Sequence, residues 1–180
     1  MSIDCRIATK SDANDIANLV NRAYRPGTSM RGWTHESHLL AGDRISFAQV
    51  RLLLRSGQTV LVMCRDGTIV ACVHVQGDAS GAWIGMLATE PALQAQGVGK
   101  STLQYAETFA AEHFKAIVVR VAVLAARPEL IAFYERRGYA RTGQIEDYPV
   151  AAGIGRPLVE GLKIEFLAKQ TTRPVFTHCA

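Results

Sequence analysis

Hydrophobic and polar positions alternate along the chain with two different periods, which predicts a protein that mixes helices with strands. A short strand is predicted over residues 3–9, and Ser11 is placed to cap the helix that follows it. Four apolar residues of this helix have the i, i+3, i+4, i+7 spacing of one buried face: Ile16, Leu19, Val20 and Ala23. A second helix is predicted over residues 43–56.

The middle of the chain has the composition of strands. Residues 59–77 predict two strands joined by an Asp-Gly turn, which is a strong hairpin signal, and residues 82–90 continue as a third strand. This hairpin sets Cys64 opposite Ile69, so that Cys64 and Cys72 are not directly paired and a disulfide between them is not expected.

The second half of the chain alternates helix and strand. The predicted elements are a helix over residues 97–113, a buried strand over 116–123, a helix over 128–138, and two strands within 139–144 and 157–169. The order β-α-α-β-β-β-α-β-α-β-β predicts an α/β (α+β) protein whose single mixed, mostly antiparallel sheet has about seven strands flanked by about four helices. We expect one domain over residues 1–180, with a tail at 171–180.

Composition and charge narrow the function classes. Hydrophobic residues make up 48% of the chain and charged residues 20%, which is typical of a globular domain. The net charge of +4 is scattered, so it suits an anionic small ligand at least as well as nucleic acid. The sequence contains neither a membrane-spanning stretch nor a signal-peptide pattern, and its cysteines lack metal-ligand spacing. We therefore expect a soluble, cytoplasmic protein without a metal.

Residues 94–102, QAQGVGKST, end like a nucleotide-binding P-loop. That motif requires a first glycine where this chain has Gln94, because the loop wraps closely around a phosphate there. Nor does the strand over residues 116–123 end in an Asp that could hold magnesium. Nucleotide hydrolysis is therefore disfavoured.

The same stretch fits another pattern, Q/R-x-x-G-x-G, formed by Gln94, Gly97 and Gly99. With MLATEP before it and RPELIAFYERRGY after it, the chain resembles the GNAT superfamily of acetyl-CoA-dependent N-acetyltransferases over nearly its whole length. The resemblance implies that a loop binds the pyrophosphate of coenzyme A, and this loop would consist of Gln94, Ala95, Gln96, Gly97, Val98, Gly99 and Lys100. Independently, a helix that begins near Gly97 favours an anion, because its first amides are unpaired and its dipole is positive there. A tight strand-to-helix turn without a ligand is the alternative.

The resemblance also implies a place for the pantetheine arm and an acid. The strand over residues 82–90 would splay from its neighbour, and the backbone of Leu87 and Thr89 would contact the arm. One of their amides would stabilise the negative charge on the thioester oxygen. Tyr134 matches the family's general acid, although a Tyr packed between helix and sheet is the alternative. Arg127 stands where many relatives carry Asn, and it either reaches a coenzyme phosphate or is a surface charge.

The acceptor side is less determined. Trp33, Glu36 and His38 lie in the segment that would line the acceptor cleft, with Trp33 either a wall of the cleft or an anchor in the core. Glu36, His38 and Glu90 are candidates for the base that takes the proton of the amine. The structural alternatives are a charge on a solvated loop for Glu36, a satisfied partner in packing for His38 and a charge at a strand end for Glu90.

These observations favour an enzyme that transfers an acetyl group from acetyl-CoA to a primary amine of a small molecule or peptide. The alternative is a non-catalytic acyl-CoA-binding or regulatory domain of the same fold, which would not need Tyr134. Protein N-termini, lysine side chains, polyamines, amino acids and aminoglycosides all remain open as acceptors. Val175 and Phe176 in the tail suggest either a homodimer contact or a tail that folds back.

Overall fold

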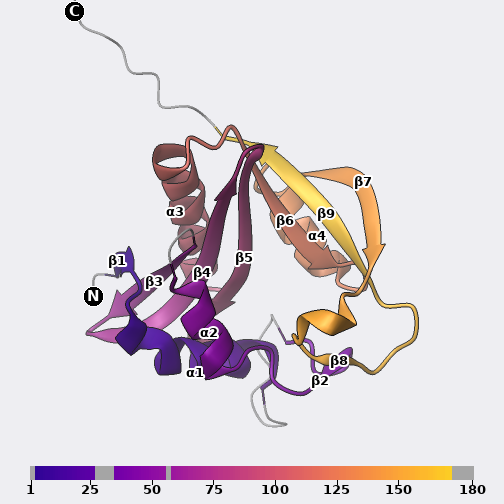
Figure 1. Cartoon of the computed structure of the whole chain (residues 1–180), viewed down its shortest axis with the longest axis horizontal. Coiled ribbons are helices and arrows are strands. Elements are labelled where there is room, and N and C mark those ends of the chain that lie inside the picture. The colour runs from indigo at the N-terminus through magenta and orange to yellow at the C-terminus, as the bar shows by residue number, and fades with distance from the viewer. Residues whose placement is uncertain (1–2, 27–34, 56–57, 172–180) are drawn as a thin grey trace, which may run out of the picture.

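The computed structural model describes residues 3–26, 35–55 and 58–171, and its main feature is a twisted sheet with helices on both faces (Figure 1). Seven strands form this sheet, in the order β1 (Asp4–Ile7), β3 (Thr59–Arg65), β4 (Thr68–Asp78), β5 (Gly81–Thr89), β6 (Val118–Leu124), β9 (Lys163–Gln170) and β7 (Ala140–Asp147). All neighbours are antiparallel except β5 and β6, which run parallel. The predicted mixed, mostly antiparallel sheet is confirmed.

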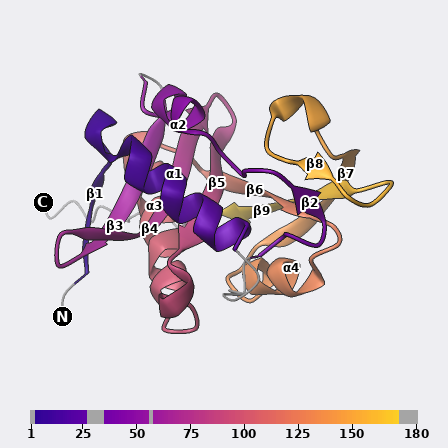
Figure 2. The ribbon, with the colours of Figure 1, turned by 90° about the horizontal axis from the view of Figure 1, so that it is seen from below.

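Two pairs of helices cover the two faces. The helices are α1 (Ala13–Tyr24), α2 (Phe47–Leu53), α3 (Val98–His113) and α4 (Pro128–Glu135). Core residues of α1 and α2 pack with one side of β3, β4 and β5, and those of α3 and α4 pack with the other side (Figure 2). The stripe predicted for the first helix is buried in full, since Ile16, Leu19, Val20 and Ala23 all lie in the core.

The starts of two helices and the last predicted strand differ from the sequence prediction. Ser11 is not the cap of the first helix, because a capping box formed by Thr9 and Asp12 starts a short 3-10 helix, η1 (Lys10–Asp12), before α1. Helix α2 is shorter than predicted, since Ser46 caps it and bonds reciprocally with Gln49. The stretch 157–169 is not one strand, because its first residue belongs to β8 (Arg156–Pro157), which pairs with β2 (Leu40–Ala41) in a separate small sheet, and β9 begins only at Lys163.

The predicted hairpin register is confirmed. Cys64 pairs with Ile69 across β3 and β4, and Cys5, Cys64 and Cys72 are free thiols. Among the described residues, no group of His, Cys, Asp and Glu could hold a metal ion, and no helix is long and apolar enough to cross a membrane.

A wedge-shaped opening in the sheet lies between β5 and β6, whose ribbons diverge from one end (Figure 1). The two strands pair only where Ala82 faces Val119 and Trp83 faces Arg120. Further along β5, an irregularity in its pairing with β4 and a positive φ of 51° at Met86 interrupt the ladder next to Leu87. Backbone groups of β5 that would bond to a neighbour are therefore left without a strand partner on that side.

Candidate active site

The loop before α3 is shaped to leave main-chain amides open. Gly97 stands at the helix N-cap with a φ of +83°, a left-handed conformation that glycine adopts without strain. The Ser101 amide donates to the Gly97 carbonyl at 3.0 Å, so the helix amides before it lack an intrahelical acceptor. Gln94 fixes the start of the loop, because its side-chain amide donates to the Thr89 carbonyl at 3.3 Å.

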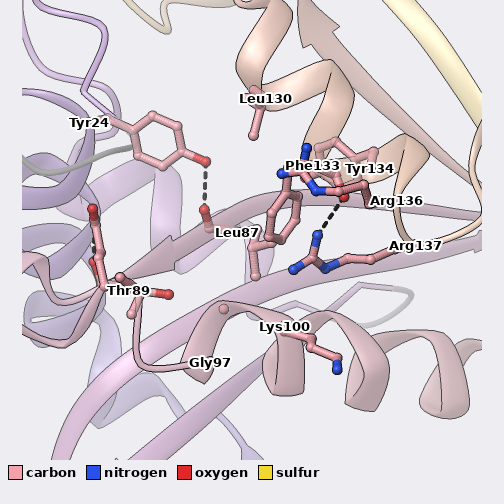
Figure 3. A pocket seen from close by; sticks show the side chains of 13 residues that line it. Tyr24, Leu87, Thr89, Gly97, Lys100, Leu130, Phe133, Tyr134, Arg136 and Arg137 are labelled. Atoms are coloured by element: carbon pink, nitrogen blue, oxygen red, sulfur yellow. Dashed lines mark hydrogen bonds between the residues drawn. The ribbon is translucent and has the colours of Figure 1, made fainter.

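A cavity of about 370 Å³ lies above this loop (Figure 3). From the predicted phosphate loop, five residues line it: Gln94, Ala95, Gly97, Gly99 and Lys100. The other two predicted residues do not line it, since the side chain of Gln96 donates to the Ala92 carbonyl and the side chain of Val98 is packed in the core. Leu87 and Thr89 also line this cavity, so the structure brings the two predicted cofactor segments together.

Three cations line the same cavity: Lys100, Arg136 and Arg137. No Asp or Glu is among its described lining residues. The two arginines were not singled out from the sequence, although both lie in the RPELIAFYERRGY stretch. Such a surplus of positive charge beside open helix amides suits a ligand with several negative charges.

Arg137 is held in a fixed position. Its guanidinium lies 3.5 Å from the centre of the Phe133 ring, and its Nη1 donates to the Phe133 carbonyl at 2.6 Å. Burial, together with the nearby charge of Arg136, lowers the pKa of Arg137 below its ordinary value. An anion bound here would relieve that cost, because neither arginine forms an ion pair with a carboxylate among the described residues.

A second cavity of about 280 Å³ opens on the far side of the wedge. It is lined by residues of β4, β5 and β6, and by Tyr148, Pro149 and Ile154 from the segment after β7. Four residues line both cavities: Tyr24, Leu87, Leu130 and Tyr134. The two cavities therefore meet at the bulged part of β5, where the sheet is open.

The two tyrosines at this junction have different hydrogen-bond roles. The Tyr24 hydroxyl donates to the Leu87 carbonyl at 2.8 Å, so its proton is already engaged (Figure 3). The Tyr134 hydroxyl, among the described residues, has no hydrogen-bond partner, and its ring is buried against Phe133 and Tyr139. Burial raises the pKa of both phenols, so both are protonated at neutral pH.

Glu36 and Arg127 lie in one buried ion-pair cluster. Glu36 is buried and bonded to Arg25 at 2.9 Å, and it lines the second cavity, which corrects the alternative of a solvated loop. Arg127 is only 2% exposed, donates to the His35 carbonyl at 3.1 Å, and pairs with Glu129. The alternative of a surface charge is wrong, and since Arg127 lines neither cavity, its position does not support a phosphate contact.

The remaining candidates for the base are separated by the structure. His38 is exposed and Glu90 is ion-paired with Arg22, and neither lines either of the two cavities described above. A further titratable residue, His74 on β4, lines the second cavity, and its Nε2 is buried without a hydrogen bond to any described residue. Burial lowers the pKa of His74 to about 4, so the ring is neutral at pH 7. Trp33 lies outside the described residues.

Comparisons with known proteins agree with this geometry. The chain is 28% identical over 149 residues to the S-(2-succino)cysteine N-acetyltransferase of Bacillus subtilis (strain 168), covering 77% of this chain and 85% of that protein. Its fold is similar to that of the ribosomal-protein-S18-alanine N-acetyltransferase of Escherichia coli, with a TM-score of 0.71 at 16% identity over 95% of both chains.

A spermidine N-acetyltransferase chimera from Vibrio cholerae and hSSAT has a TM-score of 0.67 at 13% identity, over 95% of this chain and 96% of that chain. Since the model of the acetyltransferase (GNAT) family matches residues 14–139, more than half of the sequence, the chain belongs to that family and is an acyltransferase.

Proposed function

We propose that this protein is a cytoplasmic N-acetyltransferase that moves an acetyl group from acetyl-CoA to a primary amine of a small molecule or peptide. The observation that carries the proposal is the meeting of the two cavities at Leu87 and Tyr134, inside the opening between β5 and β6. One cavity is lined by cations and open amides, whereas the other is bounded by β4, β5, β6 and the segment after β7. A donor and an acceptor can therefore approach one point from opposite sides.

The first cavity fits coenzyme A by charge and by shape. Lys100, Arg136 and Arg137, with the amides that begin α3, offer partners for its phosphates. The unpaired side of β5 offers main-chain partners to the amide groups of the pantetheine arm, as an added strand would have. When bound, acetyl-CoA supplies the activated acetyl group as a thioester.

In the proposed reaction, the neutral amine nitrogen forms a bond to the acetyl carbon and the carbon–sulfur bond breaks. The amine gives up one proton, and the departing sulfur accepts one, so the products are an amide and the free thiol of coenzyme A. Tyr134 is the proposed donor to the sulfur, because its proton is not engaged by any described residue, unlike that of Tyr24. Because burial raises its pKa, Tyr134 stabilises the departing thiolate by a hydrogen bond more readily than it transfers the proton completely, and solvent then supplies the proton of the free thiol.

Removal of the amine proton is assigned to solvent. Glu36 is bonded to Arg25, and the pKa of His74 near 4 makes it a weak base for an ammonium group of pKa about 10. The relatives do not fix the acceptor, since their names refer to S-(2-succino)cysteine, to an alanine of a ribosomal protein and to spermidine.

The variant Tyr134→Phe tests the catalytic role. It keeps the buried ring and removes the hydroxyl, so we expect kcat to fall by about 10²-fold while the melting temperature changes little. Release of the coenzyme A thiol in the presence of an amine panel measures kcat. The matched control is Tyr105→Phe on α3, an exposed tyrosine that lines neither cavity, and it should leave kcat unchanged.

The alternative function, a non-catalytic acyl-CoA-binding domain, makes a different prediction. Acetyl-CoA would then raise the melting temperature, but thiol release would not depend on any amine. Turnover that depends on an amine and is lost in Tyr134→Phe supports the enzyme. Wild-type turnover in Tyr134→Phe would show that another group assists the departing sulfur.

A further inference from the structure

The second cavity is called the acceptor cavity from here on. The charged groups that line it differ in whether they are free to bind a ligand. Among its described lining residues, two carry a full charge, Glu36 and Arg44. His74 adds no charge at neutral pH, because burial lowers its pKa to about 4. The electrostatic character of the cavity therefore depends on whether Glu36 or Arg44 is free to meet a ligand.

Glu36 is not free, because two arginines already neutralise it. Its Oε2 lies 2.9 Å from the Arg25 guanidinium, and its Oε1 lies 4.0 Å from that of Arg127. Its side chain is 8% exposed, so solvent and ligands reach little of it. An amine that approached Glu36 would have to compete with two buried guanidinium groups.

Arg44, in contrast, has no carboxylate partner among the described residues. Its guanidinium lies over the Tyr24 ring, 5.4 Å from the ring centre, and makes no ion pair there. The residues 27–34, which lie outside the described part of the chain, include no Asp or Glu. A lone cation in a partly enclosed cavity lacks the counter-charge that such groups usually have.

The backbone around Arg44 is fixed, so its position is part of the fold. The Oδ1 of Asn21 accepts hydrogen bonds from the backbone amides of Arg44 and Ile45, and the Nδ2 of Asn21 donates to the Ile45 carbonyl. Tyr24, the ring beneath the guanidinium, lies three residues later on α1 and also donates to the Leu87 carbonyl. The Arg44 guanidinium therefore lies over the ring of Tyr24, a residue that lines both cavities.

We propose that Arg44 binds a carboxylate of the acceptor, and that the acceptor is an amino acid or another amine that carries a carboxylate. This inference rests on the proposed function and specifies its substrate class. With its carboxylate on Arg44, such an acceptor extends along the Tyr24 ring and brings its amine towards Leu87 and Tyr134. A polyamine or other purely cationic acceptor is disfavoured by the same guanidinium.

The test compares matched acceptors in the thiol-release assay. Amino acids and ω-amino carboxylates of increasing length are each paired with their carboxamides, which keep the amine and lose the negative charge. We expect kcat/KM for the best carboxylate to exceed that for its amide by about 10-fold or more, since a charge-assisted hydrogen bond is lost with the amide. In Arg44→Gln, kcat/KM for the carboxylate should fall by a similar factor and the value for the amide by less than about 2-fold.

Two further variants separate charge from structure. Arg44→Lys keeps the positive charge and should retain part of the preference, whereas a purely structural role would not respond to charge. Arg51→Gln on α2 is the matched control, because Arg51 also lies over an aromatic ring, that of Phe47, but lines neither cavity. Melting temperatures of all variants identify any that fail to fold.

The outcomes distinguish the inference from the proposed function. Turnover of carboxylates and amides with equal kcat/KM, or an Arg44→Gln enzyme that keeps the wild-type preference, overturns the inference and leaves the acetyltransferase assignment intact. Absence of turnover with every amine overturns the proposed function, and the inference with it. Loss of the preference in Arg44→Gln but not in Arg51→Gln supports both.

Discussion

His74, a residue that lines the acceptor cavity, makes the stability of the fold depend on pH. It lies on β4, lines the acceptor cavity, and carries a buried Nε2 without a described partner. Burial lowers its pKa to about 4, below the value of about 6.5 of an unperturbed histidine. Between these two pH values the unfolded chain binds more protons than the folded protein, so acidification from pH 7 destabilises the fold.

The variant His74→Gln should remove this part of the pH dependence. In the wild type, the free energy of unfolding should fall by about 2 kcal/mol more between pH 7 and pH 5 than it does in the variant. Urea unfolding at the two pH values measures the difference. His38→Gln, at an exposed position, is the control and should behave as the wild type. Equal pH dependence in the wild type and His74→Gln would mean that the ring is charged in the folded state.

At the residue scale, local motifs were predictable and contacts between distant segments were not. Gln94, Gly97 and Tyr134 lie within short patterns that can be recognised from neighbours in the sequence, and the structure brings all three to one cavity. Arg44 and Tyr24 reach the site only because α1 and the segment before α2 fold against β5. No periodicity or spacing in the sequence connects those two residues with the rest of the site.

At the scale of elements, a glycine in a left-handed conformation at the start of α3 lines the cavity proposed to bind the cofactor. Gly97 has a φ of +83° and lines the first cavity, whereas Gly67 has a φ of +77° in the hairpin between β3 and β4. A Cβ added at either position would meet no atom within 4 Å. The two glycines therefore carry the same conformational requirement, and only one of them is at the site.

This pair allows strain to be separated from binding. Gly97→Ala and Gly67→Ala should each cost about 1 kcal/mol of stability, because an L-residue is disfavoured at positive φ. Only Gly97→Ala should also weaken coenzyme A binding, by about 10-fold, since relief of the strain tilts the amides that face the ligand. Calorimetry with coenzyme A gives the dissociation constants. An equal loss of coenzyme A affinity in both variants would show that the loss comes from the lower stability of the fold and not from a change in the loop before α3.

Elements with a clear period were predicted, and those without one were missed. The buried stripe of α1 and the hairpin register follow from spacings that continue over several residues. The small sheet of β2 and β8 has strands of two residues, too short to carry any alternation. Its formation depends on a pairing between Leu40 and Pro157, which are far apart in the chain.

At the scale of the whole molecule, the sheet is divided where its two halves meet. On one side lie β1, β3, β4 and β5, and on the other lie β6, β9 and β7, joined by two paired positions between β5 and β6. A ligand inserted in the opening would contact both halves, through β5 and α3 on one side and α4 on the other. Coenzyme A should therefore stabilise the molecule as a whole, and not only the loop that we propose holds its phosphates.

Comparison of coenzyme A with pantetheine separates the two contributions. At 100 times its dissociation constant, coenzyme A should add about 2.7 kcal/mol of stability, which raises the melting temperature of a domain of this size by about 5 to 10 °C. Pantetheine fills the opening but lacks the phosphates, so it should bind more weakly, and its affinity should not change with ionic strength. The affinity for coenzyme A should fall as salt is added, because Lys100, Arg136 and Arg137 contribute exposed or partly exposed charges. Salt-independent binding of coenzyme A would contradict the assignment of these three cations to its phosphates, whereas a pantetheine affinity equal to that of coenzyme A would place the binding energy in the strand opening alone.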